Sequence, residues 1–253
     1  YEILSVQAQE RPHAVALEDA RNLRVSHGQL FAKVGALIDV LHGLGVGRGA
    51  RVAIVLPNGV EMAITLLGVT CVATAVPLNP VYRREEYRAY FDEIRVGFLL
   101  TRKGFQSEAR AVASEKGVPI LELSSDGKLE LTSDARRPAG SGLAERGDVA
   151  LVLLTSGSTG RSKKVPLTHR NICVSTRDIC RTLALGPADR CLCMWEQFHV
   201  GGLVDLLLVP LASGGTVICA GGFDAARFYE LLEAKQPTWF QGVPTTLNEL
   251  SVY

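Results

Sequence analysis

The stretch that decides the fold is VALVLLTSGSTGRSKK, residues 149–164, in which an apolar run leads into glycines, small hydroxyls and two lysines. The run VALVLL predicts a buried strand. Successive backbone N–H groups of a glycine-rich turn form an anion-binding concavity, and hydroxyl side chains add further donors. We therefore predict that the loop binds phosphate. Its candidate ligands are Thr155, Ser156, Gly157, Ser158, Thr159, Gly160, Lys163 and Lys164.

The spacing of this loop differs from that of an ordinary P-loop, G-x-x-x-x-G-K-[ST]. Position 162 is Ser, and Val165-Pro166 stands where the helix of a P-loop would begin. A second glycine cluster, GLGVGRG at 43–49, has Arg48 where a dinucleotide fingerprint needs its third glycine, and it follows a helical pattern. The alternative for 155–164 is a flexible turn without a ligand, and we favour phosphate binding because four hydroxyls and two lysines gather at a strand end.

Helical and strand patterns alternate along the rest of the chain, which predicts an α/β fold with a parallel, doubly wound sheet. The polar segment 124–148 is interpreted as a surface excursion, and 165–167 as a short extended piece. Thr168 is predicted to cap the helix that follows. The predicted strands are 51–56, 74–78, 97–101, 118–123, 149–154, 190–195, 216–220 and 238–242. The predicted helices are 26–43, 60–71, 83–94, 106–117, 168–185, 203–212, 224–235 and one that begins near 243.

The composition is that of a globular protein, with 47% hydrophobic and 21% charged residues among 253. Lys and Arg number 27 against 26 Asp and Glu, so no basic excess is available to bind nucleic acid. The longest apolar run, GGLVDLLLVPLA, is interrupted by Asp205 and Pro210, which argues against a membrane span. Six cysteines, mostly inside apolar runs, suggest free buried thiols and a cytoplasmic protein. Cys191 and Cys193 have no second pair at zinc-site spacing, so we predict no metal site.

His199, within WEQFHVGGL at 195–203, follows a predicted strand. Ligands bind at the carboxyl ends of strands in open α/β sheets. The residues alone leave two alternatives open, a packed loop histidine and a ligand contact.

Four motifs in order make the chain resemble the N-terminal part of the adenylate-forming (AMP-binding) enzymes, which include acyl- and aryl-CoA synthetases, luciferases and peptide-synthetase adenylation domains. They are RVAIVLPNGVEMAITLLGVTCVATAVPLNP (51–80), TSGSTGRSKK (155–164), WEQFHVGGL (195–203) and QGVPTTLNEL (241–250). The family loop commonly has proline where this chain has Ser162 and glycine where it has Lys164. Lys163 matches the family lysine, so the resemblance gives it the pyrophosphate role and leaves Lys164 uncertain.

The resemblance implies two stacked, mostly parallel sheets with flanking helices, the large N-terminal region of that fold in truncated form. One subdomain would cover 51–181, and the other would combine 10–50 with 182–253 and be incomplete. The C-terminal lid domain of the family, with its adenylation lysine, would be absent from this chain. We therefore expect an N-terminal portion that does not complete the reaction by itself.

The implied reaction activates a carboxylic acid with Mg²⁺-ATP to an acyl-adenylate and transfers the acyl group to a thiol. The thiol would be coenzyme A or the phosphopantetheine of an acyl carrier protein. Lys163 and His199 would be the catalytic residues, and no metal ligand falls in this part of the family pattern. The acyl group would contact Phe198, His199, Gly201, Gly202, Gly242 and Val243.

The resemblance also narrows the substrate. Amino-acid-activating relatives commonly have Asp where this chain has His199, and Glu196 is the one acid in that motif. This favours a small carboxylic acid without an α-amino group. Two alternatives stay open outside this function: a non-catalytic truncated paralogue that acts as a binding module, and an unrelated phosphotransferase.

Overall fold

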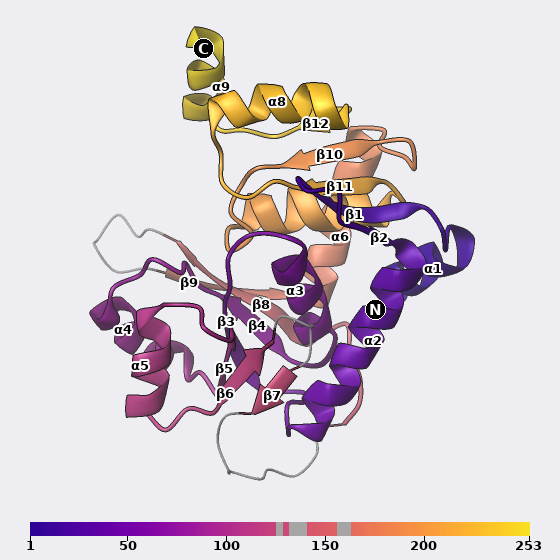
Figure 1. The fold of residues 1–253 in the computed structure, drawn as a ribbon. Coiled ribbons are helices and arrows are strands. Elements are labelled where there is room, and N and C mark those ends of the chain that lie inside the picture. The colour runs from indigo at the N-terminus through magenta and orange to yellow at the C-terminus, as the bar shows by residue number, and fades with distance from the viewer. Residues whose placement is uncertain (125–128, 132–140, 156–162) are drawn as a thin grey trace. The chain divides into compact units, whose positions relative to one another are not determined.

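The computed structural model describes residues 1–124, 129–131, 141–155 and 163–253 (Figure 1). The contacts between residues divide the chain into two compact units, each containing one sheet. The first unit comprises 1–33, 58–64 and 172–253, and the second comprises 34–57 and 65–171. Helices α2 (His27–Gly43), α3 (Val60–Val72) and α6 (His169–Thr182) have residues in both. The subdomain limits predicted from the sequence stay a prediction, and the contacts group 34–50 with 65–171.

The second unit contains a seven-stranded sheet in the order β7-β6-β5-β3-β4-β8-β9. The five inner strands run parallel because helices such as α4 (Arg84–Ile94) and α5 (Glu108–Glu115) connect them. The two edge strands, β7 and β9, pair antiparallel with their neighbours. The strands are β3 (Arg51–Val55), β4 (Thr74–Pro77), β5 (Phe98–Arg102), β6 (Ile120–Leu123), β7 (Leu129–Leu131), β8 (Val149–Thr155) and β9 (Lys163–Thr168).

The antiparallel edges correct two predictions. The segment 124–148, interpreted as a surface excursion, contains β7, and the short extended piece at 165–167 is the middle of β9. Strand β9 can pair with β8 antiparallel because only seven residues separate them, which is too few for the crossover connection that a parallel pair needs. Pro166 is tolerated because an edge strand leaves one row of N–H positions without ladder partners. Thr168 caps α6 as predicted: its Oγ1 accepts a hydrogen bond from the Asn171 N–H at 3.2 Å.

The core of this unit lies between the sheet and helices α4 and α5, which contact each other (Figure 1). Tyr87 is fully buried there, and its hydroxyl donates to the carbonyl oxygen of Asn79 at 2.7 Å. Phe91 and Ile94 continue the same face of α4 at helical spacing. The sequence period therefore explains which face of α4 is buried.

The first unit contains a five-stranded sheet in the order β12-β10-β11-β1-β2, in which only the β1–β2 pair is antiparallel. Its strands are β1 (Val15–Asp19), β2 (Arg24–Ser26), β10 (Arg190–Cys193), β11 (Thr216–Cys219) and β12 (Trp239–Phe240). Its remaining helices are α1 (Glu2–Glu10), the π-helix η1 (Gly201–Leu208), α7 (Val209–Ala212), α8 (Ala225–Lys235) and α9 (Pro244–Val252). The α/β class and the two sheets with flanking helices are as predicted.

The single helix predicted at 203–212 differs in type and bounds from the observed structure. It is a π-helix from Gly201 to Leu208 that passes into the short α7. Pro210 lies in the first turn of α7, where its missing N–H costs least. π-Helical turns are rare and occur frequently at functional sites. In the part of the chain that the structure describes, no helix is both long enough and apolar enough to cross a membrane.

Candidate functional site

Strands β8 and β9 present the two ends of the predicted phosphate loop side by side. Thr155 and Lys163 are Cα partners in the antiparallel register, and Leu154 is the partner of Lys164. The five loop residues predicted as phosphate ligands between them, Ser156, Gly157, Ser158, Thr159 and Gly160, lie outside the described residues. The hairpin therefore brings together the hydroxyl that opens the loop and the lysine that closes it.

The two lysines have different surroundings. Successive side chains of a strand point to opposite faces, so Lys163 and Lys164 diverge. Nζ of Lys164 donates to the carbonyl oxygen of Glu93 at 3.2 Å and lies 4.0 Å from its carboxylate. Lys163 is exposed, and its ammonium makes no ion pair or hydrogen bond with any residue that the structure describes. Lys163 is thus the cation of the pair that stays available for an anion.

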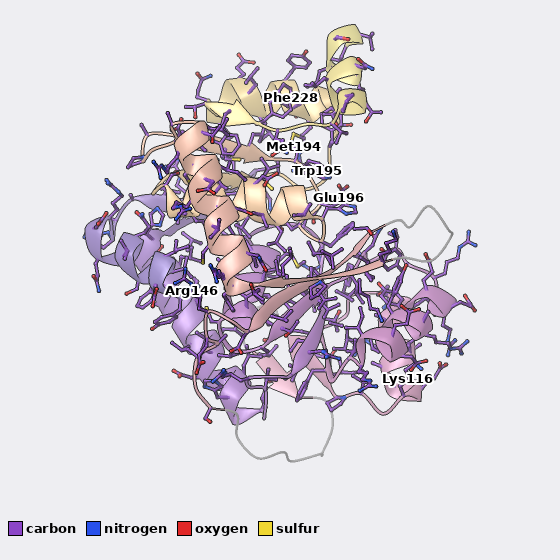
Figure 2. All side chains as sticks on the ribbon, turned by 180° about the vertical axis from the view of Figure 1, so that it is seen from behind. Lys116, Arg146, Met194, Trp195, Glu196 and Phe228 are labelled. Carbon is purple, nitrogen blue, oxygen red and sulfur yellow. The ribbon has the colours of Figure 1, made fainter. Side chains whose placement is uncertain are left out.

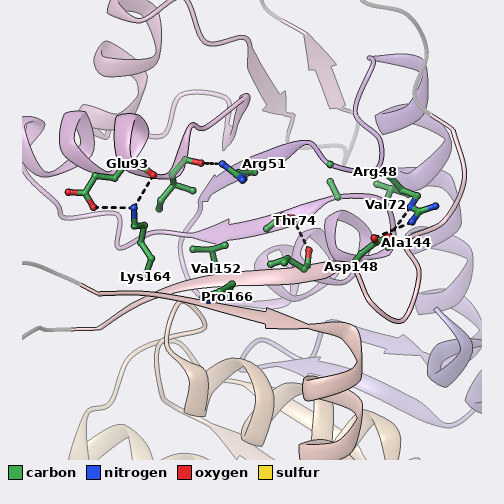
Figure 3. A pocket seen from close by; sticks show the side chains of 14 residues that line it. Arg48, Arg51, Val72, Thr74, Glu93, Ala144, Asp148, Val152, Lys164 and Pro166 are labelled. Carbon is green, nitrogen blue, oxygen red and sulfur yellow. Dashed lines mark hydrogen bonds and ion pairs between the residues drawn. The ribbon is translucent and has the colours of Figure 1, made fainter.

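Figure 3 shows the cavity into which Lys164 points, about 390 Å³ in volume and lined by residues of the second unit. Lys164 and Arg51 both donate to carbonyls of the last turn of α4: Lys164 to Glu93, and Arg51 to Ile94 at 2.6 Å. Cations at a helix C-terminus satisfy its free carbonyls and its dipole. The structure therefore gives Lys164 a role in capping α4, which the sequence did not indicate.

The predicted histidine lies in the first unit, in the turn between β10 and η1. Figure 2 shows Met194, Trp195 and Glu196 in this segment, with Phe228 of α8 near Met194, and Met194 and Phe228 share a hydrophobic cluster. The His199 N–H donates to the carbonyl oxygen of Glu196 at 3.0 Å, which closes the turn. The ring of His199 is exposed and lies 4.6 Å from that of Phe198. The turn therefore presents an imidazole beside an aromatic ring.

Gly201 and Gly202 allow the π-helix to lie close to Trp195 and Glu196, in the segment that follows β10. A Cβ on Gly202 would lie 2.2 Å from the carbonyl oxygen of Glu196, and one on Gly201 would lie 2.5 Å from the indole of Trp195. Gly242 is similarly close to the side chain of Thr246, at 2.9 Å. Internal packing thus accounts for these glycines, whose predicted role against the acyl group stays a prediction. Val243, the last of the predicted substrate contacts, is partly exposed just before α9.

A pair of side-chain amides that the sequence did not single out fixes the base of the His199 turn. The side-chain oxygen of Gln197 accepts from the Gly59 N–H at 2.8 Å, and the Gln197 N–H donates to the side-chain oxygen of Asn58 at 2.9 Å. Gln197 is only 1% exposed. These reciprocal bonds tie the start of α3 to the segment that carries His199, across 139 positions of sequence.

A second missed pair joins the two predicted acyl-binding segments. The carboxylate of Asp205, on η1, accepts from the side-chain amide of Gln241 at 3.1 Å. Both residues line a cavity of about 680 Å³ between α6, η1 and β12. Burial raises the pKa of Asp205, and the hydrogen bond from Gln241 opposes that rise only in part. The signal was present in the sequence, because Asp205 is the one charge within GGLVDLLLVPLA.

The buried cysteines give no sign of metal chemistry. Cys193 and Cys219 are register partners on β10 and β11, and burial raises the pKa of Cys193 to about 12. Burial also raises the pKa of Cys191 and Cys219 well above the ordinary value. Thiols in this state behave as small apolar side chains. Among the described residues, no three His, Cys, Asp or Glu side chains are grouped to hold a metal ion.

The predicted site residues therefore fall into two sets. Thr155, Lys163 and Lys164 belong to the second unit. The set of the first unit is Phe198, His199, Gly201, Gly202, Gly242 and Val243. Within the first unit, the Asp205–Gln241 bond brings the 198–202 and 242–243 segments together.

Comparison with known proteins identifies the family. A family model described as AMP-binding enzyme matches residues 4–252. The chain belongs to this family. The probable CoA ligase CCL9 of Humulus lupulus is 33% identical over an alignment of 261 positions, gaps included, that covers 92% of this chain and 47% of that protein. An oxalate–CoA ligase of Saccharomyces cerevisiae is 33% identical over an alignment of 229 positions that covers 79% of this chain and 42% of that protein.

Solved structures of the AMP-binding family agree with this assignment. ATP-bound MatB from Rhodopseudomonas palustris superposes with a TM-score of 0.84 at 26% identity, over 98% of this chain and 50% of that one. The chain spans about half the length of the curated relatives it matches. The adenylate-forming resemblance and the α/β architecture predicted from the sequence are thereby confirmed.

Proposed function

We propose that this chain supplies the N-terminal half of an AMP-forming acid–thiol ligase. A carboxylate oxygen of the acid attacks the α-phosphorus of ATP and pyrophosphate leaves; the acceptor thiol then attacks the adenylate carbonyl and AMP leaves. The observation that carries the proposal is the β8–β9 hairpin of a family member, in which Thr155 and Lys163, whose ammonium has no partner among the described residues, flank the phosphate-loop sequence. Fixed donors and a cation stabilise the charge that gathers on the leaving pyrophosphate.

In this proposal Lys163 and Thr155 hold the β- and γ-phosphates together with the loop residues 156–160. Lys164, which the sequence also suggested, contributes through α4 instead, because its ammonium already contacts Glu93. His199 and Phe198 stand at the junction of acid and adenylate, and the turn closed on Glu196 keeps them in place. Each residue then acts by position and charge.

Magnesium, when bound to the nucleotide, would neutralise phosphate charge. The described residues of this chain offer no acidic cluster for it, so we assign it no ligand here. The acceptor is proposed to be coenzyme A, since the relatives are named as CoA ligases. The acid is proposed to be a small carboxylic acid without an α-amino group, because the residue after Phe198 is His199 and not an aspartate.

ATP–pyrophosphate exchange by the full-length protein, measured over a panel of carboxylic acids, tests the adenylation step. Thioester formation with coenzyme A and, separately, with a phosphopantetheinylated carrier protein tests the acceptor. We expect acid-dependent exchange, transfer to coenzyme A, and no turnover by residues 1–253 alone. Transfer only to the carrier protein would mean that the acceptor is the carrier and not coenzyme A. Nucleotide binding without acid-dependent pyrophosphate exchange would mean that the protein is a binding module.

A further inference from the structure

The cavity between α6, η1 and β12 is lined by acidic side chains and by no basic ones among its described residues. Its described lining residues include two carboxylates, Asp178 and Asp205, and no lysine, arginine or histidine. Asp178 is exposed and forms an ion pair with its neighbour Arg177 at 2.8 Å. Asp205 has no cation beside it, and its one hydrogen bond among the described residues comes from the neutral amide of Gln241. The cavity therefore presents one uncompensated carboxylate to a ligand.

Apolar side chains accompany this carboxylate. Ile179 of α6 and Phe240 of β12 line the same cavity, which suits a hydrocarbon stem. A half-buried carboxylate with a single neutral donor gains from a second donor, because its charge is poorly solvated. A second anion in the same place would be repelled, since like charges interact strongly where water is partly excluded. This cavity wall, formed by Asp205, Ile179 and Phe240, therefore favours a ligand with a hydrogen-bond donor or a cation and disfavours one with a carboxylate or sulfonate.

The position of Asp205 relates this wall to the proposed reaction. Asp205 lies on the π-helix that begins two residues after His199, and Gln241 directly precedes Gly242. The side-chain bond between them therefore lies where the two acyl-binding segments meet. An acid with its carboxylate near His199 would extend its far end along this wall.

We propose that Asp205, held by Gln241, selects acids whose far end carries a hydrogen-bond donor, a hydroxyl or an ammonium group, over acids that carry a second anionic group there. This rests on the proposed function only for the placement of the reacting carboxylate. Asp205 would be a specificity-determining residue that takes no part in the reaction at phosphorus. The ligand class follows from the charge and shape of the cavity itself.

The experiment compares four acids of equal length with the full-length protein: hexanoate, 6-hydroxyhexanoate, 6-aminohexanoate and adipate. Pyrophosphate exchange gives kcat/KM for each, and titration calorimetry gives Kd whether or not exchange occurs. We expect adipate to be the poorest by about tenfold or more relative to the hydroxy and amino acids. In Asp205→Asn, which keeps shape and the bond to Gln241, the ratio of adipate to 6-aminohexanoate should rise by about tenfold or more.

Glu230→Gln on α8 removes an exposed carboxylate of the same unit and should leave the ratio unchanged. Equal or better use of adipate by the wild type, or an unchanged ratio in Asp205→Asn, would overturn the proposal. If no acid supports exchange but calorimetry shows the same order of binding, the proposed ligase function fails while the selectivity of the cavity stands. If exchange occurs without discrimination at the far end, the function stands and the role of Asp205 fails.

Discussion

Asp205 accepts a hydrogen bond from Gln241 at 3.1 Å, and this bond joins two segments that lie 36 residues apart in the chain. One segment carries His199 and the π-helix, and the other carries Gly242 and Val243. Side chains on different elements with a direct bond usually have coupled energies. The two segments predicted to contact the acyl group are therefore linked directly, and a substitution at Asp205 or Gln241 is expected to affect the other residue.

The two lysines at the start of β9 are expected to differ in effect. Lys163→Ala should lower kcat/KM of the full-length protein for ATP roughly 100-fold or more, because it removes a fixed cation from the developing pyrophosphate. Lys164→Ala should lower it less than about tenfold and instead reduce the free energy of unfolding by about 0.3–1 kcal/mol, because α4 loses a C-terminal cation. Pyrophosphate exchange and urea denaturation measure the two effects.

The comparison has an internal control in Lys116, an exposed lysine of the same unit that pairs with Asp92. Lys116→Ala should leave kcat/KM for ATP unchanged. Equal losses of activity for the two variants at 163 and 164 would mean that both lysines contact phosphate, which contradicts the role assigned to Lys164.

Gly202→Ala is expected to destabilise the protein by about 1–3 kcal/mol, because the new Cβ would meet the backbone of Glu196 at 2.2 Å. Gly35→Ala is the matched control: it lies inside α2 with nothing within 4 Å of the added carbon, and it should stabilise by up to about 1 kcal/mol. Thermal unfolding of both variants checks the pair. A neutral Gly202→Ala would show that η1 can move away from the backbone of Glu196 without loss of stability.

Local patterns in the sequence predicted most elements, since apolar periodicity shows directly which face of a helix or strand is buried. The predicted helix at 60–71 is α3, and the predicted strand at 51–56 is β3. Strand β7 was missed because its three residues, LEL, lie in a polar segment and are too short for a periodic signal. The π-helix was missed because its pattern resembles that of an α-helix, and the approach of Glu196 to Gly202 is a tertiary feature.

Only those residues of the candidate site that belong to sequence motifs could be predicted. The motifs gave Lys163 and His199 and left the role of Lys164 uncertain. They could not indicate that Lys164 caps α4, because the carbonyl of Glu93 that engages it is 71 residues away. The same holds for Gln197 and Asn58, whose side chains meet across the fold. Pairings at such separation depend on the packing of whole elements.

The buried carboxylate of Glu18 gives a prediction about pH. Its side chain is 1% exposed and bonds to Lys235 at 2.9 Å and to Arg190 at 3.0 Å. Burial raises the pKa of Glu18, but the hydrogen bonds from Lys235 and Arg190, together with the charges of Lys235 and Arg24, outweigh burial and leave the pKa below its ordinary value of 4.5. A carboxyl group whose pKa is lowered in the folded state stabilises above its unfolded pKa. That contribution is therefore expected to be lost as the pH falls from about 4.5 through the folded-state pKa.

Lys235→Met should make the loss of stability below about pH 4.5 smaller, because with one strong partner fewer the folded-state pKa of Glu18 rises towards its unfolded value. At neutral pH the variant should lose about 3 kcal/mol of unfolding free energy, since the buried carboxylate loses one of its cationic partners and keeps Arg190. Lys116→Met, which breaks an exposed pair, should lose less than about 1 kcal/mol. Urea denaturation from pH 3 to pH 7 measures both, and equal losses would argue against a buried ionic cluster.

The amide pair below the His199 turn is expected to act as one unit. Asn58→Ala leaves the backbone N–H of Gln197 without a hydrogen-bond acceptor, and Gln197→Met leaves the backbone N–H of Gly59 without one. Each substitution should therefore lower the free energy of unfolding by about 1–3 kcal/mol. Because both substitutions loosen the same connection between α3 and the turn, the double variant should cost at least about 0.5 kcal/mol less than the sum.

The same variants test whether the pair also positions His199. If it does, kcat of the full-length protein with its best acid should fall by about tenfold in each single variant while KM for ATP changes little, because the phosphate loop belongs to the other unit. Asn248→Ala, an exposed asparagine of α9, controls for loss of an amide and should change neither quantity. Additive changes in unfolding free energy combined with an unchanged kcat would mean that the Asn58–Gln197 bonds hold neither α3 nor the His199 turn.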